Sequence, residues 1–142
     1  MVEVKINKLS KDHPSPVYAR PGDAGFDLRS TEEKIILAGQ KEIIKTGIKL
    51  AIPEGYVGLI WDRSGMAAKY SIKSMGGVID SSYRGEIGVI LYNLSKEDFK
   101  VEIGMRIAQM LIQPVVSATL VDTETLEQTD RGDGKFGHTG NF

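Results

Sequence analysis

The stretch that decides the fold, residues 48–61, reads IKLAIPEGYVGLIW. Its first part alternates, so Ile48, Leu50 and Ile52 lie on one face of a predicted β-strand. Pro53-Glu54-Gly55 carries the residues of a tight turn, and a further short apolar run, Tyr56–Trp61, follows it. The pattern predicts a strand, a turn and another strand, and not a helix with an apolar residue every three to four positions.

Short strands of this kind recur along the chain. Val2, Val4 and Ile6 alternate near its start. Further apolar runs occur at Lys34–Leu37, Glu42–Thr46, Glu86–Asn93, Phe99–Ile103 and Arg106–Pro114. Many short strands spaced about ten residues apart favour an all-β fold, either an antiparallel sandwich or a barrel. Only Ser64–Tyr70 has the composition of a short helix, which Ser64 is expected to cap.

The length of 142 residues suits one domain with a substantial core. Two segments look irregular: His13–Gly22, which contains three prolines, and the tail from about Glu127. We therefore expect residues 1–126 to form a single β domain and residues 127–142 to form a flexible C-terminal arm.

Composition excludes several classes of function. The 18 basic and 19 acidic residues nearly cancel, so no bulk charge is available to hold DNA, RNA or a membrane surface. Cysteine is absent from the sequence, which excludes disulfides and thiolate metal sites. We find no leader-like segment and no apolar run of membrane-spanning length. The expectation is an intracellular, cytoplasmic protein without nucleic-acid or membrane partners, with a nuclear or viral origin left open.

The tail, residues 131–142, reads RGDGKFGHTGNF and combines flexibility with ligand-binding chemistry. Its four glycines leave it unable to bury a core of its own. Arg131 and Lys135 suit phosphate, Thr139 offers a hydroxyl, and Phe136 offers a ring for stacking. The glycines also fit dinucleotide and phosphate-loop motifs, but both motifs need a following helix, for which no residues remain. These features favour a mobile lid over an anionic, flat-ringed ligand; the alternative is a frayed terminus without a function.

Arg63-Ser64-Gly65 follows a predicted strand and opens the predicted helix. An arginine, a hydroxyl and the free amides of a helix start make a suitable anion site. An ordinary serine cap beside a surface arginine explains the same three residues.

The segment Gly76–Gly85, GGVIDSSYRG, carries more information. Gly76 and Gly77 permit close approach of a ligand, whose edge the backbone of the following Val-Ile step then reads as if it were another strand. Asp80 would repel a polyphosphate, so it suits the orientation and deprotonation of a water molecule. Tyr83 offers a flat wall for a sugar. The alternative is a plain turn in which Asp80 bonds its own backbone.

Two further segments are weaker signals. Residues 24–28, AGFDL, contain Asp27 within an apolar step, and residues 104–110, GMRIAQM, place Arg106 and Gln109 on a strand after a turn. A purely structural role is enough to explain each segment. Arg106, for example, suits a buried ion pair.

Together, five segments resemble the five ordered motifs of the homotrimeric dUTP pyrophosphatases (dUTPases). They are Ala24–Ser30, Arg63–Ala67, Gly77–Gly85, Gly104–Gln109 and Arg131–Gly140. The resemblance implies a jelly-roll-like β-sandwich or barrel, of the dUTPase-like β-clip type, with one short helix. It also implies a homotrimer with three sites at subunit interfaces, each covered by the arm of a neighbouring chain. The implied reaction is Mg²⁺-dependent hydrolysis of dUTP to dUMP and pyrophosphate, which keeps uracil out of DNA.

The resemblance also implies roles for the fixed part of the site. Asp80 is implied as the base that orients the water attacking the α-phosphorus. Tyr83 would press on the deoxyribose, while the backbone from Gly77 to Ile79 reads uracil. The implied phosphate ligands are Arg63, Ser64, Gly65 and Gln109, with Arg63 also offsetting the charge that develops. Asp27 resembles the acid that contacts, through water, a magnesium ion chelated mainly by the triphosphate.

In the arm, the implied substrate contacts are Arg131, Phe136, Gly137, His138 and Thr139. Phe136 would stack on uracil, and Arg131 and Thr139 would reach the terminal phosphate. His138 stands where the family usually has serine. Because an imidazole donates best when protonated, we expect substrate affinity to weaken as the pH rises through the range in which histidine loses its proton.

A second departure is Asp62, where a proline often precedes the motif arginine. Neighbouring strand residues point in opposite directions, so Asp62 is expected to face away from Arg63. Two alternative functions remain open at this point. One is a dCTP deaminase of the same fold, and the other is a non-catalytic, nucleotide-binding regulatory module.

Overall fold

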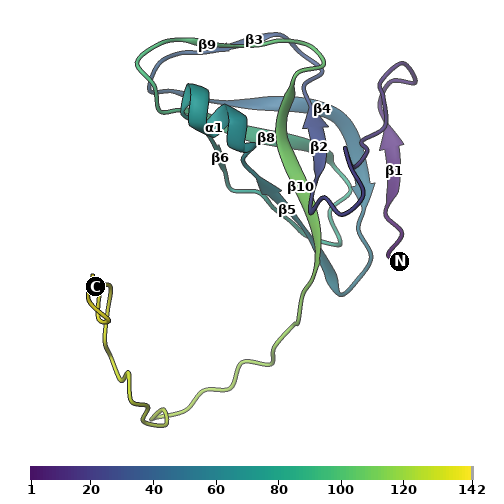
Figure 1. The fold of residues 1–142 in the computed structure, drawn as a ribbon. Helices are drawn as coiled ribbons and strands as arrows, with labels where there is room; N and C mark the ends of the chain where they lie inside the picture. The colour runs from purple at the N-terminus through teal and green to yellow at the C-terminus, as the bar shows by residue number, and fades with distance from the viewer. Residues whose placement is uncertain (142) are drawn as a thin grey trace.

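The computed structural model describes residues 1–141 and contains, among them, ten strands and one helix (Figure 1). The helix is α1 (Ser64–Tyr70). The strands are β1 (Lys5–Lys8), β2 (Phe26–Arg29), β3 (Lys34–Ile36), β4 (Lys41–Ala51), β5 (Tyr56–Trp61), β6 (Ile72–Met75), β7 (Val78–Ile79), β8 (Glu86–Asn93), β9 (Phe99–Val101) and β10 (Arg106–Pro114). The prediction of an all-β fold with one short helix is confirmed.

The strands form two four-stranded sheets and one small two-stranded pair. The first sheet has the order β1-β4-β8-β6, the second has the order β2-β10-β5-β7, and β3 pairs with β9. Every pairing is antiparallel. Although β4 and β5 are joined by a short turn, they belong to different sheets, so the turn at Pro53-Glu54-Gly55 carries the chain from one sheet to the other.

The core consists of the inward faces of both sheets. In β8, Ile87, Val89 and Leu91 are buried and alternate with partly exposed residues, as the period of two predicts. In the second sheet, Leu28 and Met110 are fully buried. Their neighbours along each strand, Asp27 on β2 and Gln109 on β10, therefore point to the outward face of that sheet. The polar candidates lie on this face.

The predicted element bounds agree with the structure over β5, β8, β10 and α1. Three predictions need correction. The runs around Glu42–Thr46 and Ile48 are one strand, β4, because a bulge at Gly47 (φ 67°) shifts the register between Lys45 and Lys49 without ending the pairing. The first strand begins only at Lys5.

The third correction concerns the helix start. Arg63, and not Ser64, is the N-cap residue, and within residues 1–141 no side chain caps this helix. Strand β6 was not predicted, because it follows α1 directly and buries a serine, Ser74, on its inward face. That serine interrupts the apolar alternation from which a strand is recognised.

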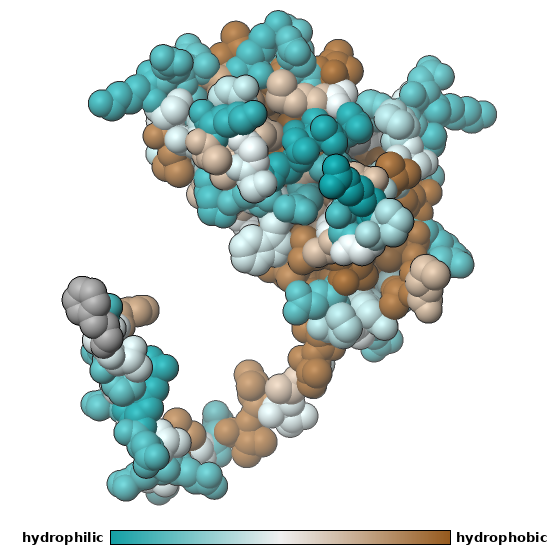
Figure 2. Space-filling view, viewed as in Figure 1, coloured by the Kyte–Doolittle hydropathy of each residue, from teal (hydrophilic) through white to brown (hydrophobic). Residues whose placement is uncertain are grey.

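Beyond β10 the chain leaves the sandwich as an extended arm (Figure 1). Figure 2 shows it as a thin line of side chains, apolar where it departs and hydrophilic towards its end. Turns at the tip are closed by backbone hydrogen bonds within the arm, for example from Gly134 N to Arg131 O (3.1 Å) and from His138 N to Lys135 O (3.2 Å). The arm's last residue, 142, lies outside the described residues. In the described part of the chain, none of the helical structure is long and apolar enough to cross a membrane.

Candidate active site

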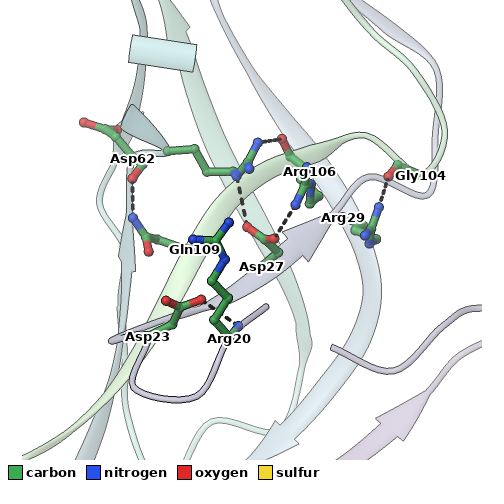
Figure 3. A network of polar contacts seen from close by, with 9 residues as sticks. Arg20, Asp23, Asp27, Arg29, Asp62, Gly104, Arg106 and Gln109 are labelled. Atoms are coloured by element: carbon green, nitrogen blue, oxygen red, sulfur yellow. Dashed lines mark hydrogen bonds and ion pairs between the residues drawn. The ribbon is translucent and has the colours of Figure 1, made fainter. Parts of the chain in front are cut away.

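The corner between β5 and α1 positions an arginine over the second sheet. Arg63 has extended backbone angles (φ −86°, ψ 125°), and its side chain contacts one residue of β2 and one of β10. Its Nε donates to Oδ1 of Asp27 at 2.9 Å, and its Nη1 donates to the carbonyl of Arg106 at 3.4 Å (Figure 3). The guanidinium is therefore held above the strands, with part of its donor set still directed outward.

Strand register brings the other polar candidates to the same place. Asp27 on β2 lies opposite Gln109 on β10, which lies opposite Trp61 on β5, so all three side chains share one face of the sheet. Gln109 Nε2 donates to the carbonyl of Asp62 at 2.8 Å. Arg106 Nη1 donates to the second carboxylate oxygen of Asp27 at 3.3 Å. Asp27 thus lies between two guanidinium groups, as Figure 3 shows.

These residues line a polar pocket of about 270 Å³. Its lining consists of Ala19, Asp23, Ala24, Gly25, Asp27, Arg63, Ser64, Gly65, Arg106 and Gln109. A volume below the ~300–1,000 Å³ of pockets that enclose a drug-sized ligand suits part of a nucleotide, such as its phosphates. A larger groove beside β1 is lined mainly by apolar side chains, including Val4, Ile6 and Tyr18, and is less suited to an anion.

Gly25 in this pocket is a residue whose role was missed in the sequence. A Cβ at this position would lie 2.9 Å from Oε1 of Gln109 and 3.2 Å from the carbonyl of Met110. A larger residue would push Gln109 away from Asp62. The sequence did contain a signal for this role, because Gly25 lies in the segment around Asp27. Only the strand pairing shows that the side chain which the glycine accommodates is that of Gln109.

The second group of candidates lies at the opposite edge of this sheet. Strand β7 pairs with β5, and in residues 1–141 no strand pairs with its other edge. The chain reaches β7 through Gly76 and Gly77, which have φ angles of 64° and 95° that favour glycine. The carbonyl of Gly77 accepts a hydrogen bond from Ile60 N at 2.8 Å, which anchors the start of β7. The outer edge of the backbone of Val78 and Ile79 is thus available to a ligand.

A turn follows β7 and presents Asp80 and Tyr83. Tyr83 N donates to the carbonyl of Asp80 at 3.1 Å, and Tyr83 Oη donates to the carbonyl of Glu86 at 3.0 Å. The expected turn is therefore present. Among residues 1–141, however, the carboxylate of Asp80 accepts no hydrogen bond from the backbone of that turn. Asp80 is exposed, and the Tyr83 ring lies across Gly85, where an added Cβ would be 2.9 Å from Cε2 of the ring.

Within one chain the two groups are far apart. Ile79 pairs with Gly58 on β5, whereas Gln109 and Asp27 are in line with Trp61. Three residues span about 10 Å along a strand, and the three strand spacings from β2 to β7 span about 14 Å, so the backbones of Asp27 and Ile79 are about 17 Å apart. The arm residues Arg131, Phe136, Gly137, His138 and Thr139 line neither group.

Asp62 and Arg63 diverge as expected. Arg63 contacts Asp27, whereas the carboxylate of Asp62 accepts hydrogen bonds from Lys73 and Ser74 on β6. Arg106 does form the expected ion pair, but the pair is not buried, since the Arg106 side chain is 44% exposed.

Comparison with known proteins identifies the family. The sequence model of dUTPase matches residues 11–140. The chain belongs to the dUTPase family. It is 47% identical over 142 residues to the deoxyuridine 5'-triphosphate nucleotidohydrolase of Alkaliphilus metalliredigens, covering 99% of each chain. It is 46% identical to the protein of the same name from Clostridium acetobutylicum, covering 99% of this chain and 98% of the other.

Solved dUTPase structures share the fold. A mutant of the Staphylococcus bacteriophage 80alpha dUTPase with dUpNHpp aligns with a TM-score of 0.90 at 30% identity, covering 97% of this chain and 98% of that one. A mutant dUTPase from phage phi11 of S. aureus, whose structure reveals the coordination of a structural Mg(II) ion, aligns with a TM-score of 0.82 at 27% identity, over 89% and 99% of the two chains. The predictions of dUTPase membership and of a jelly-roll-like fold are confirmed.

Proposed function

We propose that this dUTPase-family chain hydrolyses dUTP to dUMP and pyrophosphate by attack of an Asp80-activated water on the α-phosphorus. The chain is an enzyme of the dUTP diphosphatase class, because it matches that family over nearly its whole length. The observation that carries the proposal is the polar pocket in which Arg63, Arg106 and Gln109 surround Asp27. Its two guanidinium groups suit the phosphates of such a substrate. The proposed location is intracellular.

Recognition of the base and sugar is assigned to β7 and the turn after it. The unpaired outer edge of the backbone from Gly77 to Ile79 supplies alternating N–H and C=O groups, which suit the hydrogen-bonding edge of uracil. The Tyr83 ring, held by its hydrogen bond to Glu86 and by contact with Gly85, forms a wall against C2′ of the sugar. A 2′-hydroxyl has no room against such a wall, so deoxyribonucleotides are preferred over ribonucleotides.

The phosphates are assigned to the pocket beneath α1. Arg63 and Gln109 donate side-chain hydrogen bonds, and Ser64 and Gly65 donate from the first turn of the helix. In the arm, Arg131, Gly137, His138 and Thr139 contact the phosphates from above, and Phe136 stacks on the exposed face of uracil. The Phe136 side chain is fully exposed in the extended arm, so stacking also removes apolar surface from water.

The chemical step needs a base and a stabilised leaving group. Asp80 accepts a proton from water as the water oxygen forms its bond to the α-phosphorus. The bond from this phosphorus to the bridging oxygen breaks in line, and pyrophosphate leaves with its electron pair. Arg63 offsets the charge that develops on the phosphoryl oxygens, and the closed arm excludes bulk water. No covalent intermediate is required.

The residues of this site fit a magnesium ion that is bound mainly by the phosphates of the substrate. Both oxygens of Asp27 are engaged by arginines, and in the described part of the chain no cluster of three or more His, Cys, Asp or Glu side chains is able to hold a metal by itself. Mg²⁺ commonly retains several waters and binds through substrate phosphates with only one or two carboxylates. Asp27 therefore suits contact through those waters, and the bound ion supplies charge neutralisation for the triphosphate.

The separation within one chain supports a shared site. Asp80 and the Arg63 guanidinium must lie on either side of one phosphoryl group, with the water and the arginine each within about 3–3.5 Å of it. The Arg63 guanidinium contacts Asp27, and the backbone of Asp27 is about 17 Å from that of Ile79, the residue before Asp80, which is too wide for this. We therefore assign Asp80 and Arg63 of one site to different chains of a homotrimer, with the arm also contributed by a neighbour.

Pyrophosphate release tests the proposal. Purified protein is incubated with dUTP, dTTP, dCTP and UTP, each with and without Mg²⁺. Release from dUTP alone, with strong dependence on Mg²⁺, is the expected result. Ammonia from dCTP would indicate a deaminase, and binding of dUTP without turnover would indicate a regulatory module. Removal of residues 127–142 should abolish most of the activity, and an unchanged rate would refute the role of the arm.

A further inference from the structure

Asp62, at the β5–α1 corner, is held from several directions, yet it touches no part of the proposed substrate. Its Oδ1 accepts hydrogen bonds from Ser74 N (2.5 Å) and Ser74 Oγ (2.7 Å). Its Oδ2 pairs with Lys73 Nζ at 2.7 Å. Its backbone carbonyl accepts from Gln109 Nε2 at 2.8 Å. One residue thus joins three strands, β5, β6 and β10.

The carboxylate of Asp62 is held in its charged form. Burial by itself would raise the pKa of Asp62, but the hydrogen bonds from Lys73 and Ser74 and the charge of Lys73 outweigh burial and leave the pKa below its ordinary value of 3.8. The Asp62 side chain is 21% exposed and Ser74 is buried, so water competes little for the two bonds from Ser74, whereas the Lys73 side chain is 49% exposed. Charge-assisted hydrogen bonds of this kind are about twice as strong as neutral ones.

These contacts bridge the two sheets at the base of the helix. Strand β5 belongs to the second sheet and β6 to the first, and α1 is the connection between them. Asp62 immediately precedes Arg63, the N-cap residue of α1. Ser74 lies on β6, the strand that follows the helix. The Asp62–Ser74 contact therefore closes the loop that contains α1, and it fixes where the first turn of the helix stands relative to β10.

The same contacts determine the position of two phosphate ligands. Arg63 is the next residue along the chain and the N-cap of α1, so its backbone direction depends on the placement of Asp62. Gln109 is oriented by its hydrogen bond to the Asp62 carbonyl. If the Asp62 carboxylate is lost, the corner is released from β6, and the two ligands no longer share a fixed spacing.

We propose that Asp62 is a positioning residue that locks the β5–α1 corner onto β6 and so sets the geometry with which Arg63 and Gln109 grip the substrate's polyphosphate. This inference rests on the proposed function. It assigns Asp62 to the phosphate half of the site alone, because base and sugar are read by β7 and the following turn, which Asp62 does not contact. Loss of Asp62 should therefore weaken triphosphate binding and leave the binding of deoxyuridine, which has no phosphate, unchanged.

The test compares Asp62→Ala with Asp98→Ala. Asp98 is a matched control because its Oδ1 also accepts a backbone hydrogen bond, from Ala38 N at 2.9 Å, and it does not line the polar pocket. Dissociation constants are measured for α,β-imido-dUTP and for deoxyuridine, together with KM and kcat for dUTP. Hydrogen bonds to charged phosphate oxygens are strong, so misplacing the Arg63 and Gln109 donors should weaken the affinity for the imido analogue by about tenfold or more. The affinity for deoxyuridine should change by less than about twofold.

Two milder variants keep the test decisive if Asp62→Ala fails to fold. Asp62→Asn retains an acceptor for Ser74 and removes the charge, and Lys73→Met removes the ion pair and leaves the carboxylate. Both should shift the imido-dUTP constant in the same direction by less than Asp62→Ala does, and Asp98→Ala should shift neither constant. Equal weakening of deoxyuridine and imido-dUTP, or no weakening of either in all three variants, would overturn the proposal. Absence of dUTP hydrolysis by the wild-type chain would instead overturn the proposed function.

Discussion

Mixing two inactive variants of this chain should restore activity, because Asp80 follows β7 at one edge of a sheet, whereas the Arg63 guanidinium contacts Asp27 on β2 at the other edge. The register places Ile79 opposite Gly58, while Arg63 contacts Asp27 in line with Trp61. The resulting separation of about 17 Å is roughly twice what one phosphoryl group spans between a base-bound water and an arginine. In the proposed shared site, Asp80→Asn and Arg63→Gln therefore damage halves that belong to different chains.

The expected recovery follows from random assembly. In a closed oligomer formed from equal amounts of the two variants, a site is intact when its Asp80 comes from the Arg63→Gln chain and its Arg63 from the Asp80→Asn chain. Each condition holds for about half of the sites, so about a quarter of wild-type activity should return. The assay is pyrophosphate release from dUTP after the variants are unfolded together and refolded, or after co-expression with two affinity tags.

A second mixture serves as the control. Wild-type chain combined with an equal amount of the Asp80→Asn, Arg63→Gln double variant should fall to about a quarter of wild-type activity if sites are shared, and to about a half if each site lies within one chain. Recovery no greater than the average of the two single variants, together with the half-activity result in the control, would refute the register argument.

Four further results are expected. Asp80→Asn should lower kcat by about a hundredfold or more and leave the dissociation constant of α,β-imido-dUTP nearly unchanged; equal loss of affinity would indicate a structural aspartate. Gly85→Ala should displace the Tyr83 ring and narrow the preference for dUTP over UTP, measured as the ratio of kcat/KM values, and an unchanged ratio would contradict the role of that wall. Because the folded-state pKa of Asp62 is lowered, its carboxylate contributes stability above pH 3.8, and the contribution disappears as the pH falls through the lowered value. The difference in Tm between wild type and Asp62→Asn should therefore be constant near neutrality and shrink in acid, whereas a difference that grows in acid would be contrary to this sign. Finally, His138→Ser should remove the decline in substrate affinity that we expect as the pH rises, and identical pH profiles of the two proteins would exclude a phosphate contact from the imidazole.

Local sequence patterns were sufficient to predict the elements that have turn residues on both sides and a regular alternation or a run of helix formers between them. The alternation and flanking turns of Glu86–Asn93 and Arg106–Pro114 predicted β8 and β10 with their observed bounds, and the helix formers of Ser64–Tyr70 predicted α1. The same patterns failed where pairing overrides them. Gly47 resembles a break between strands but forms a bulge within β4, because β8 continues to pair on both sides of it.

The sequence by itself determined which chemical groups this protein carries and, through five ordered motifs, the family to which it belongs. Only the tertiary structure decided which of those groups meet: Asp27 is 36 residues from Arg63 and 79 residues from Arg106, yet one carboxylate binds both. It also decided that Asp80 stands apart from them and that Asp62 joins two sheets. The physical reason is that polarity patterns act over a few neighbouring residues, whereas contact between distant segments depends on strand order and register, which the packing of the whole core selects.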